Sequence, residues 1–370
     1  KQHVTNYFDI TARAMENSSQ RIAQELTNTT SSSEGYYVCW LKADSYEEYM
    51  TLLIMKCYVN PFVSFVGFVS NMISLAILRH SGLHKPSHLL LFSLVVADTM
   101  CLTSTLNYGM IIFYFGPDKF FPRLCGFQYD LVVNVYLTIS SICMEFFAYW
   151  GQCVNSWIPV LITLERLVAI FKPIAFKSIV TKKRTLSLIL FSFLFWLPWH
   201  VYSYQLVHVV ERTYQEKIYL VVGYENYNDM MLMNLIEGKI LEHLKSSIPV
   251  ILIIVGCFCL YIKIGISIRN RSKLTTSYNS RLSSTRTTRT LMLTCFIFVV
   301  TQLMYIALMS IEMSVYEIHY IVRDEFVYLC NNINASSNLF VYITSNKKLY
   351  DIFLQFFRRP SKPNIHNHLA

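Results

Sequence analysis

Charged residues are scarce in this sequence. Only 15% of its 370 residues are Asp, Glu, Lys or Arg, whereas 54% are hydrophobic. A soluble domain carries about 25% charged residues, so the composition excludes a soluble enzyme of this size and indicates a protein with several membrane spans. The formal net charge is +9. Because the basic residues lie in the gaps between apolar runs, they indicate cytoplasmic loops and not a nucleic-acid partner.

Metal-binding and catalytic patterns are missing as well. The ten cysteines are dispersed, without a CxxC motif and without zinc-site spacing to histidine, so we expect neither a zinc site nor a redox centre. His243 and His319 lie at the edges of the spans, so no His/Asp or Ser/His arrangement supports an enzyme inside the membrane. The chain also lacks the internal repeat and broken helices that are typical of transporters.

Residues 1–50 form a polar segment with Ser/Thr clusters and two N-x-S/T sequons, at Asn17 and Asn28. These sequons are glycosylation sites if the segment lies outside the cell, and we interpret it as an extracellular N-terminal tail. The sequence begins at Lys1 and has no apolar signal segment here. We therefore expect a truncated or processed chain in which the first span acts as the targeting signal.

Seven apolar runs follow within residues 51–346, and they predict an all-α bundle of seven transmembrane helices. The third run is part of a zone that starts near Leu131, longer than the roughly 20 residues that a span needs. We expect its start to be an extended connection and its helix to begin near Ile139. The predicted spans are about Leu52–Leu78, Ser87–Tyr114, Ile139–Ile170, Thr185–Gln205, Ser246–Ile268, Thr290–Met313 and Ile321–Ser345.

The loop charges predict the orientation of the bundle. Lys and Arg are in excess after the first, third and fifth spans and in the C-terminal tail, whereas most loop acids lie in the N-terminal tail and the fourth-to-fifth connection. By the positive-inside rule the N-terminus is outside and the C-terminus inside. Residues 347–370 begin with an amphipathic pattern that predicts an interfacial helix followed by a cytoplasmic tail; its apolar members are Leu349, Tyr350, Phe353, Phe356 and Phe357.

A set of polar residues lies inside the predicted spans. Asp98 is near the middle of the second span, where an unpaired carboxylate is costly and tends to mark an ion or proton site. Asn71, Asn155, Asn334 and Asn338 lie in the first, third and seventh spans, and each alone could simply hydrogen-bond neighbouring helices. Together the five residues suit one water-filled site that holds a sodium ion or a proton.

A charged pair, Glu165–Arg166, lies near the end of the third span. A charged side chain alone at such a depth costs about 2.5–3.5 kcal/mol, so the pair needs a reason. In one alternative, Arg166 extends to the interface beside a compensating acid. In the other, the pair is a switch at the cytoplasmic end of the helix, where Glu165 restrains Arg166 at rest and releases it to a partner.

The motifs around these residues resemble those of rhodopsin-class G-protein-coupled receptors. SNMISLAIL contains Asn71, LVVAD ends at Asp98, and ERLVAIFKP starts at Glu165; they are similar to the motifs of the first three helices of that class. Trp196 and Pro249 fall where the fourth and fifth helices carry a Trp and a Pro. NASSNLFVY resembles the seventh-helix motif that is usually written NPxxY.

This resemblance covers about residues 60–357 and implies a receptor in the plasma membrane that has no catalytic activity. It implies that Arg166 meets a heterotrimeric G protein, that Tyr342 swings inward on activation, and that Ile174 is a hydrophobic contact in the second cytoplasmic loop. It also implies a central polar site, with a possible sodium ion near Asp98 and no other cofactor. The implied switch residues are Glu165, Arg166, Pro173, Ile174 and Tyr342, and those of the polar site are Asn71, Asp98, Asn155, Asn334 and Asn338.

The sequence departs from that class at several switch positions. Leu167 replaces the aromatic residue after Arg, and Leu339 replaces the seventh-helix Pro. Gln302 and Met304 stand where many members have Trp and Pro, and Cys257 stands where the fifth helix normally offers a Tyr. These changes leave open a decoy protein with the same architecture that does not signal.

The usual outer disulfide of the class is excluded, because residues 197–256 contain no cysteine. Cys143 lies near the corresponding position of the third helix. A disulfide between Cys39 and Cys125 is one alternative, and free or lipid-facing cysteines are the other.

Two ligand classes are excluded by single positions. No Lys occurs in residues 321–345, so retinal has no Schiff-base partner, and Ala148 stands where monoamine receptors have an acid.

TQLM in the sixth helix and NASSNLFVY resemble invertebrate FMRFamide-like neuropeptide receptors. Acids before the fifth span and Glu145 would suit a cationic amidated peptide, or they merely keep the loop soluble. A chemosensory receptor for a small molecule is the alternative; the candidate pocket residues are Glu145, Tyr149, Gln152, Gln302, Tyr305 and Tyr328.

Overall fold

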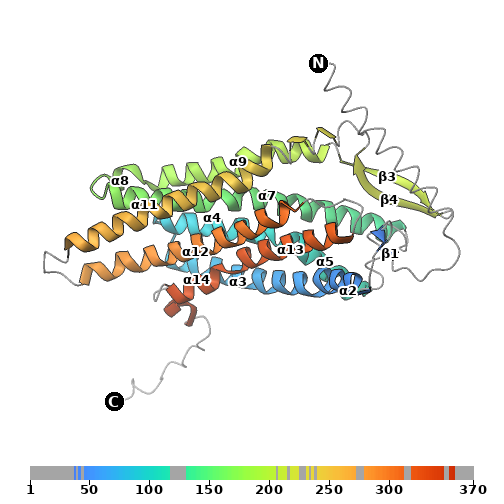
Figure 1. Cartoon of the computed structure of the whole chain (residues 1–370), viewed down its shortest axis with the longest axis horizontal. Helices are drawn as coiled ribbons and strands as arrows, with labels where there is room; N and C mark the ends of the chain where they lie inside the picture. The colour runs from blue at the N-terminus through green and yellow to red at the C-terminus, as the bar shows by residue number, and fades with distance from the viewer. Residues whose placement is uncertain are drawn as a thin grey trace, which may run out of the picture.

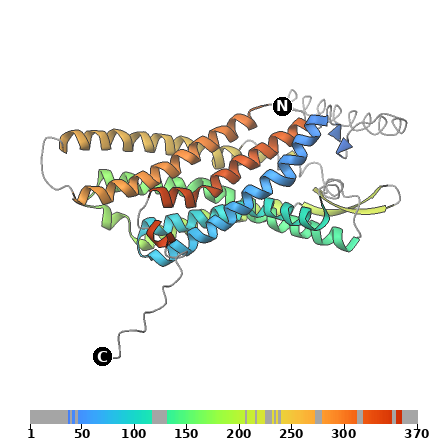
Figure 2. The ribbon, with the colours of Figure 1, turned by 90° about the horizontal axis from the view of Figure 1, so that it is seen from below.

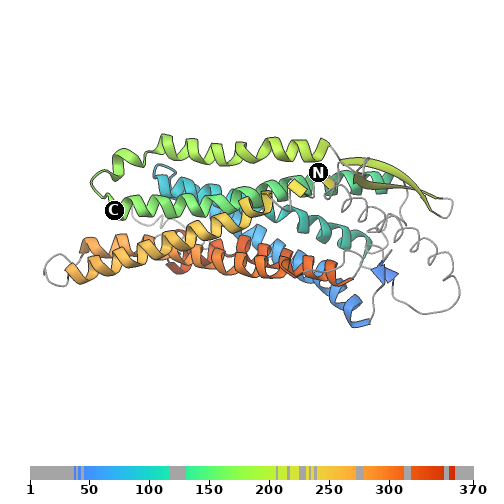
Figure 3. The same cartoon turned by 45° about the horizontal axis from the view of Figure 1, so that its top comes forward.

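The structure is a computed structural model in which seven helical rods run side by side along one axis (Figures 1, 2 and 3). Asn17, Asn28, Cys39 and Cys125 lie outside the residues that it describes, so the glycosylation sites and the disulfide stay predictions. The described residues are 37–38, 41–42, 46–116, 131–205, 207–214, 217–224, 231–232, 235–236, 240–271, 279–311, 318–345 and 350–354.

The first rod joins α2 (Tyr46–Ile54), the π-helical segment η1 (Met55–Val59) and α3 (Asn60–Ser81). The second joins α4 (Pro86–Cys101) and α5 (Thr103–Phe115). The turn between the rods follows from two residue types. Gly82 ends α3 with a φ of 88°, a conformation that glycine adopts without steric cost, and Pro86 begins α4, where its missing N–H has no intrahelical acceptor to lose.

The third rod, α7, spans Leu131–Phe171, and its start corrects the prediction. It begins eight residues before Ile139, so the expected extended connection is helical. A helix of 41 residues is about 60 Å long at 1.5 Å per residue, roughly twice the thickness of a hydrocarbon core. The thickness of the bilayer limits the length of the part of the helix that lies in lipid, but it does not limit the total length of the helix. The short α8 (Phe176–Ile179) and the fourth rod, α9 (Lys182–Gln205), follow.

The last three rods complete the bundle. The fifth joins η3 (His243–Ser247) and α11 (Ile248–Arg271), and the sixth, α12, spans Asn279–Met309. The prediction placed the sixth span at 290–313, but the helix continues through the preceding polar and basic stretch and ends four residues earlier. The seventh joins α13 (Ile318–Ser336) and α14 (Asn338–Ser345), and residues 350–354 beyond it are helical.

Two antiparallel hairpins lie outside the rods. Strand β3 (Val207–Tyr214) pairs with β4 (Lys217–Tyr224), and β1 (Tyr37–Val38) pairs with β2 (Leu41–Lys42). They lie at one end of the bundle, which we call the hairpin end, and α8 lies at the opposite end, the switch end (Figure 1). Arg166 lies near the switch end, because it is five residues before the end of α7, which α8 follows. Neither hairpin was expected from the sequence. The bundle itself is all-α, as predicted.

The bundle carries apolar side chains on its outside and polar ones inside. Phe62, Phe258 and Phe296 are each more than 60% exposed, whereas Asp98 and Asn71 are at most 2% exposed. Among the residues that the structure describes, five helices are long and apolar enough to cross a membrane, and the apolar part of α12, Leu293–Met309, is shorter. This pattern is that of a bundle whose outer surface meets lipid and whose interior is held partly by polar contacts.

Candidate functional site

The central polar site forms where α4 meets the break in the seventh rod. α13 ends at Ser336 and α14 begins at Asn338, whose Nδ2 donates a 2.5 Å hydrogen bond to Oδ2 of Asp98. Asn71 on α3 donates from Nδ2 to the carbonyl oxygen of Ala335 at 3.0 Å. The break therefore supplies a backbone carbonyl and a side-chain amide to the polar residues of the two neighbouring helices.

Several oxygens of this site are buried without a partner among the described residues. They are Oδ1 of Asn71, Asp98 and Asn155 and the hydroxyl of Tyr342. Asn155 interacts with the thiol of Cys101, less than one turn beyond Asp98 on the same helix. Because buried polar atoms without partners are costly, each of these amide and carboxylate oxygens is an atom to which a cation or an ordered water would bind.

Asn334 takes a different place from the other predicted members of this site. It is 8% exposed on α13, and its backbone carbonyl accepts hydrogen bonds from the N–H and the hydroxyl of Ser337, at 3.2 and 2.8 Å. These two bonds lie at the end of the helix, two residues before Asn338. The structure thus gives Asn334 a role at the break through its backbone.

The charged pair at the switch end is held by a third residue. Glu165 is 5% exposed, and its Oε2 lies 3.4 Å from Nη2 of Arg166. Ser87, in the first turn of α4, donates to Oε1 of Glu165 at 2.6 Å and accepts from Nη2 of Arg166 at 2.8 Å. We call these three residues the Ser87 triad. Sequence reasoning missed Ser87, whose only signal was its place at the start of the second span.

The loop after α7 presents an isolated apolar side chain. α7 ends at Phe171, and a turn through the exposed Pro173 leads to α8. Ile174 in this turn is 99% exposed. A single exposed apolar side chain is common on protein surfaces, so the contact role of Ile174 stays a prediction.

A buried ion pair between the first and seventh rods lies toward the hairpin end. Nζ of Lys56 is 3.0 Å from Oε1 of Glu325, and their side chains are 11% and 1% exposed. Asn60 donates from Nδ2 to Oε2 of Glu325 at 2.8 Å, and Nζ of Lys56 lies 5.2 Å from the ring centroid of Tyr108. Lys56 is in the π-helical segment η1, where three consecutive residues are buried, and such segments often occur at functional sites.

The predicted pocket residues fall into separate groups. Tyr328 on α13 interacts with the side chain of Tyr149 on α7 and lies within electrostatic range of Tyr108 and Glu145. These residues adjoin the Lys56 pair, because the charge of Glu145 also acts on that lysine.

Tyr305 belongs to a second group, on α12. Nζ of Lys245 lies 5.9 Å from its ring centroid and 2.9 Å from Oε2 of Glu242. Gln302, on the same helix, is 9% exposed, and Gln152 is half-buried on α7. Sequence reasoning missed Lys56, Glu325 and Lys245, whereas Glu242 is one of the acids before the fifth span that it proposed for a cationic peptide.

A bundle of seven helices with a lipid-facing exterior, a buried central acid and a restrained Glu–Arg pair at one end defines a seven-helix membrane receptor. Residues 69–342 match the family described as 7 transmembrane receptor (rhodopsin family). The chain belongs to this family, whose members are multi-pass plasma membrane receptors and not enzymes.

Individual relatives match at low identity. A probable G-protein coupled receptor of Caenorhabditis elegans is 24% identical over 156 residues, which are 41% of this chain and 34% of that protein. The human thyrotropin-releasing hormone receptor is 25% identical over 178 residues, 48% of this chain and 40% of that receptor, and the bovine receptor matches equally. The matched part therefore spans less than half the length of these relatives.

Proposed function

We propose that this protein is a neuropeptide receptor that binds its ligand at the hairpin end and activates a heterotrimeric G protein at the switch end. The Ser87 triad carries this proposal. It holds the guanidinium of Arg166, whose side chain is 13% exposed, against an acid and a serine, and the fully exposed Ile174 follows eight residues later, after the end of α7. A G protein that is recruited only after a rearrangement needs both a charge that is held back at rest and an exposed apolar side chain to contact.

The mechanism is a shift between two packings of the bundle. In the resting packing, the guanidinium of Arg166 is occupied by Glu165 and Ser87. A ligand that binds a second packing more tightly raises the population of that packing by its ratio of affinities and no more. When the triad opens, Arg166 becomes available to the G protein at the switch end, which we propose faces the cytoplasm.

A peptide ligand is supported by the polar clusters on the hairpin side of the central site. The cluster around Tyr328 contains two acids, Glu145 and Glu325, and one base, Lys56. Its net formal charge is therefore −1, which favours a ligand with a basic group. The matched human and bovine relatives are named as receptors for a hormone. A small environmental molecule stays the alternative ligand.

The central polar site fits a sodium ion. Asp98 would supply the charge, and Asn71 and Asn155 would supply neutral oxygens, because their Oδ1 atoms have no other partner in the described part of the chain. Oxygen donors of this kind are the ligands that hard cations prefer. A bound cation would supply a counter-charge that favours the packing in which Asp98 is buried.

The proposal is tested by expressing the receptor in cells and measuring calcium and cAMP while a neuropeptide library and an odorant library are applied. Replacement of Arg166 by Ala should abolish the response to an active ligand without preventing ligand binding. Arg79→Ala, at an exposed position at the end of α3, is the matched control. A response that survives Arg166→Ala would refute the proposed coupling, and a chain that binds ligand without any second messenger would be a decoy.

A further inference from the structure

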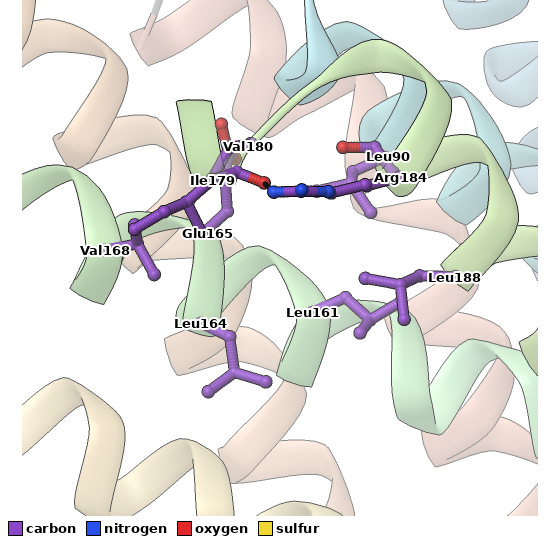
Figure 4. A pocket seen from close by; sticks show the side chains of 10 residues that line it. Leu90, Leu161, Leu164, Glu165, Val168, Ile179, Val180, Arg184 and Leu188 are labelled. Carbon is purple, nitrogen blue, oxygen red and sulfur yellow. Dashed lines mark hydrogen bonds between the residues drawn. The ribbon is translucent and has the colours of Figure 1, made fainter. Parts of the chain in front are cut away.

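A pocket of about 150 Å³ opens at the switch end between α4, α7 and α9. Figure 4 shows the side chain of Arg184 along one side of it, near Leu90, with Leu161, Leu164 and Leu188 across from it. Leu164 and Leu188 in its wall are each 50% exposed, so the pocket faces outward, where acyl chains surround the bundle. Its aliphatic wall is formed by Leu90, Leu161, Leu164, Val168 and Leu188.

Arg184 supplies the charge of this pocket. Its Nη1 donates to the carbonyl oxygens of Ser178 and Ile179, at 2.8 and 3.2 Å, which fixes the side chain against the end of α8. Its Nη2 and Nε have no acceptor among the residues that the structure describes. The acid in the pocket, Glu165, is engaged in the Ser87 triad, so the charge of Arg184 remains available to an anion.

Further basic residues surround the same rim. Lys177 on α8 and Lys182 and Lys183 on α9 are exposed, and the first turn of α9 contains no acid. Cations in the first turn of a helix oppose the helix dipole, so helix stability does not account for their position. An anion bound at this rim would be attracted both by these side chains and by the N-terminal end of α9.

We propose that this pocket binds an anionic phospholipid of the leaflet at the switch end. One acyl chain lies against the leucines, and the phosphate or carboxylate of the headgroup binds Arg184 and Lys182. A basic pocket between transmembrane helices beside an anionic leaflet suits this ligand class. A sterol has no negative charge to pair with Arg184, and a soluble phosphate has no acyl chain to pack against the apolar wall. The proposal concerns lipid binding alone and does not rest on the proposed peptide or G protein.

The test is a lipid titration of the purified full chain in neutral detergent, followed by native mass spectrometry. The probes are phosphatidylserine, phosphatidylcholine and chain-free glycerophosphoserine. Phosphatidylserine should bind the first site most tightly, and Arg184→Gln should weaken this binding about fivefold, the effect of one basic residue near an anionic surface. Leu164→Trp should block the pocket, with Leu164→Phe as a second variant if the first does not fold.

The matched control is Arg79→Gln, which removes one charge at the same end of the bundle but away from the pocket. It should leave the first binding constant unchanged. Equal weakening by Arg79→Gln and Arg184→Gln would show only general attraction to anionic lipid and overturn the site. Equal binding of phosphatidylcholine, unchanged binding in the folded Leu164 variant, or full competition by glycerophosphoserine would each overturn it as well.

Discussion

Replacing Ser87 by alanine should raise the basal activity of the receptor. The hydroxyl of Ser87 donates to Glu165 and accepts from Arg166, so the change removes two hydrogen bonds to charged groups that are mostly buried. Each such bond contributes about 1.5–3 kcal/mol. If the resting packing loses the free energy of one such bond and the active packing is unaffected, the ratio of active to resting receptor rises about 10- to 150-fold.

The assay is ligand-independent nucleotide exchange by the G protein, normalised to receptor at the cell surface. Ser93→Ala is the matched control, because Ser93 lies on the same helix and its hydroxyl donates only to the carbonyl of Leu90, at 2.9 Å. The control should behave as wild type, and adding Arg166→Ala to Ser87→Ala should abolish the increase. Basal exchange of Ser87→Ala equal to that of the Ser93 control, at equal surface level, would refute the role of the triad.

Three further changes test other parts of the structure. Lys56→Met leaves Glu325 buried and uncompensated, so we expect a loss of about 3–5 kcal/mol, read as a lower thermal midpoint, and partial recovery in the double variant with Glu325→Leu; an unchanged midpoint in Lys56→Met would contradict this. A Cβ on Gly256 would lie 2.4 Å from a threonine methyl group on α7, so Gly256→Ala should cost about 1–3 kcal/mol, whereas Gly265→Ala, with nothing within 4 Å, should not destabilise. Replacing sodium by choline should raise agonist affinity in wild type and have no effect in Asp98→Asn, as measured by radioligand competition.

The sequence predicted the seven helices because long apolar runs and the more polar gaps between them can be recognised from composition alone. It failed at the ends of α7 and α12. Their helices continue into Leu131 and Asn279 because hydrogen bonding and side-chain propensity do not change where the lipid ends. An apolar run therefore shows where a span crosses the membrane, but it does not show at which residues the helix begins and ends.

Residue chemistry predicted part of the site. Asp98 was identifiable because an acid within an apolar run needs a partner, and Asn338 provides one. Ser87 was not, because a serine in the first turn of a helix is ordinary and its two bonds depend on how α4 packs against α7. Lys56 and Glu325 were missed because the π-helical segment turns Lys56 inward, and the sequence pattern does not show that change of helical register.

The central claim is that Arg166, released from Glu165 and Ser87, binds the G protein. It is tested most directly by measuring the binding of a nucleotide-free heterotrimer to the purified receptor in lipid nanodiscs, using surface plasmon resonance. We predict tighter binding to Ser87→Ala than to wild type and no binding to Arg166→Ala. Equal affinities for the three proteins would contradict the account.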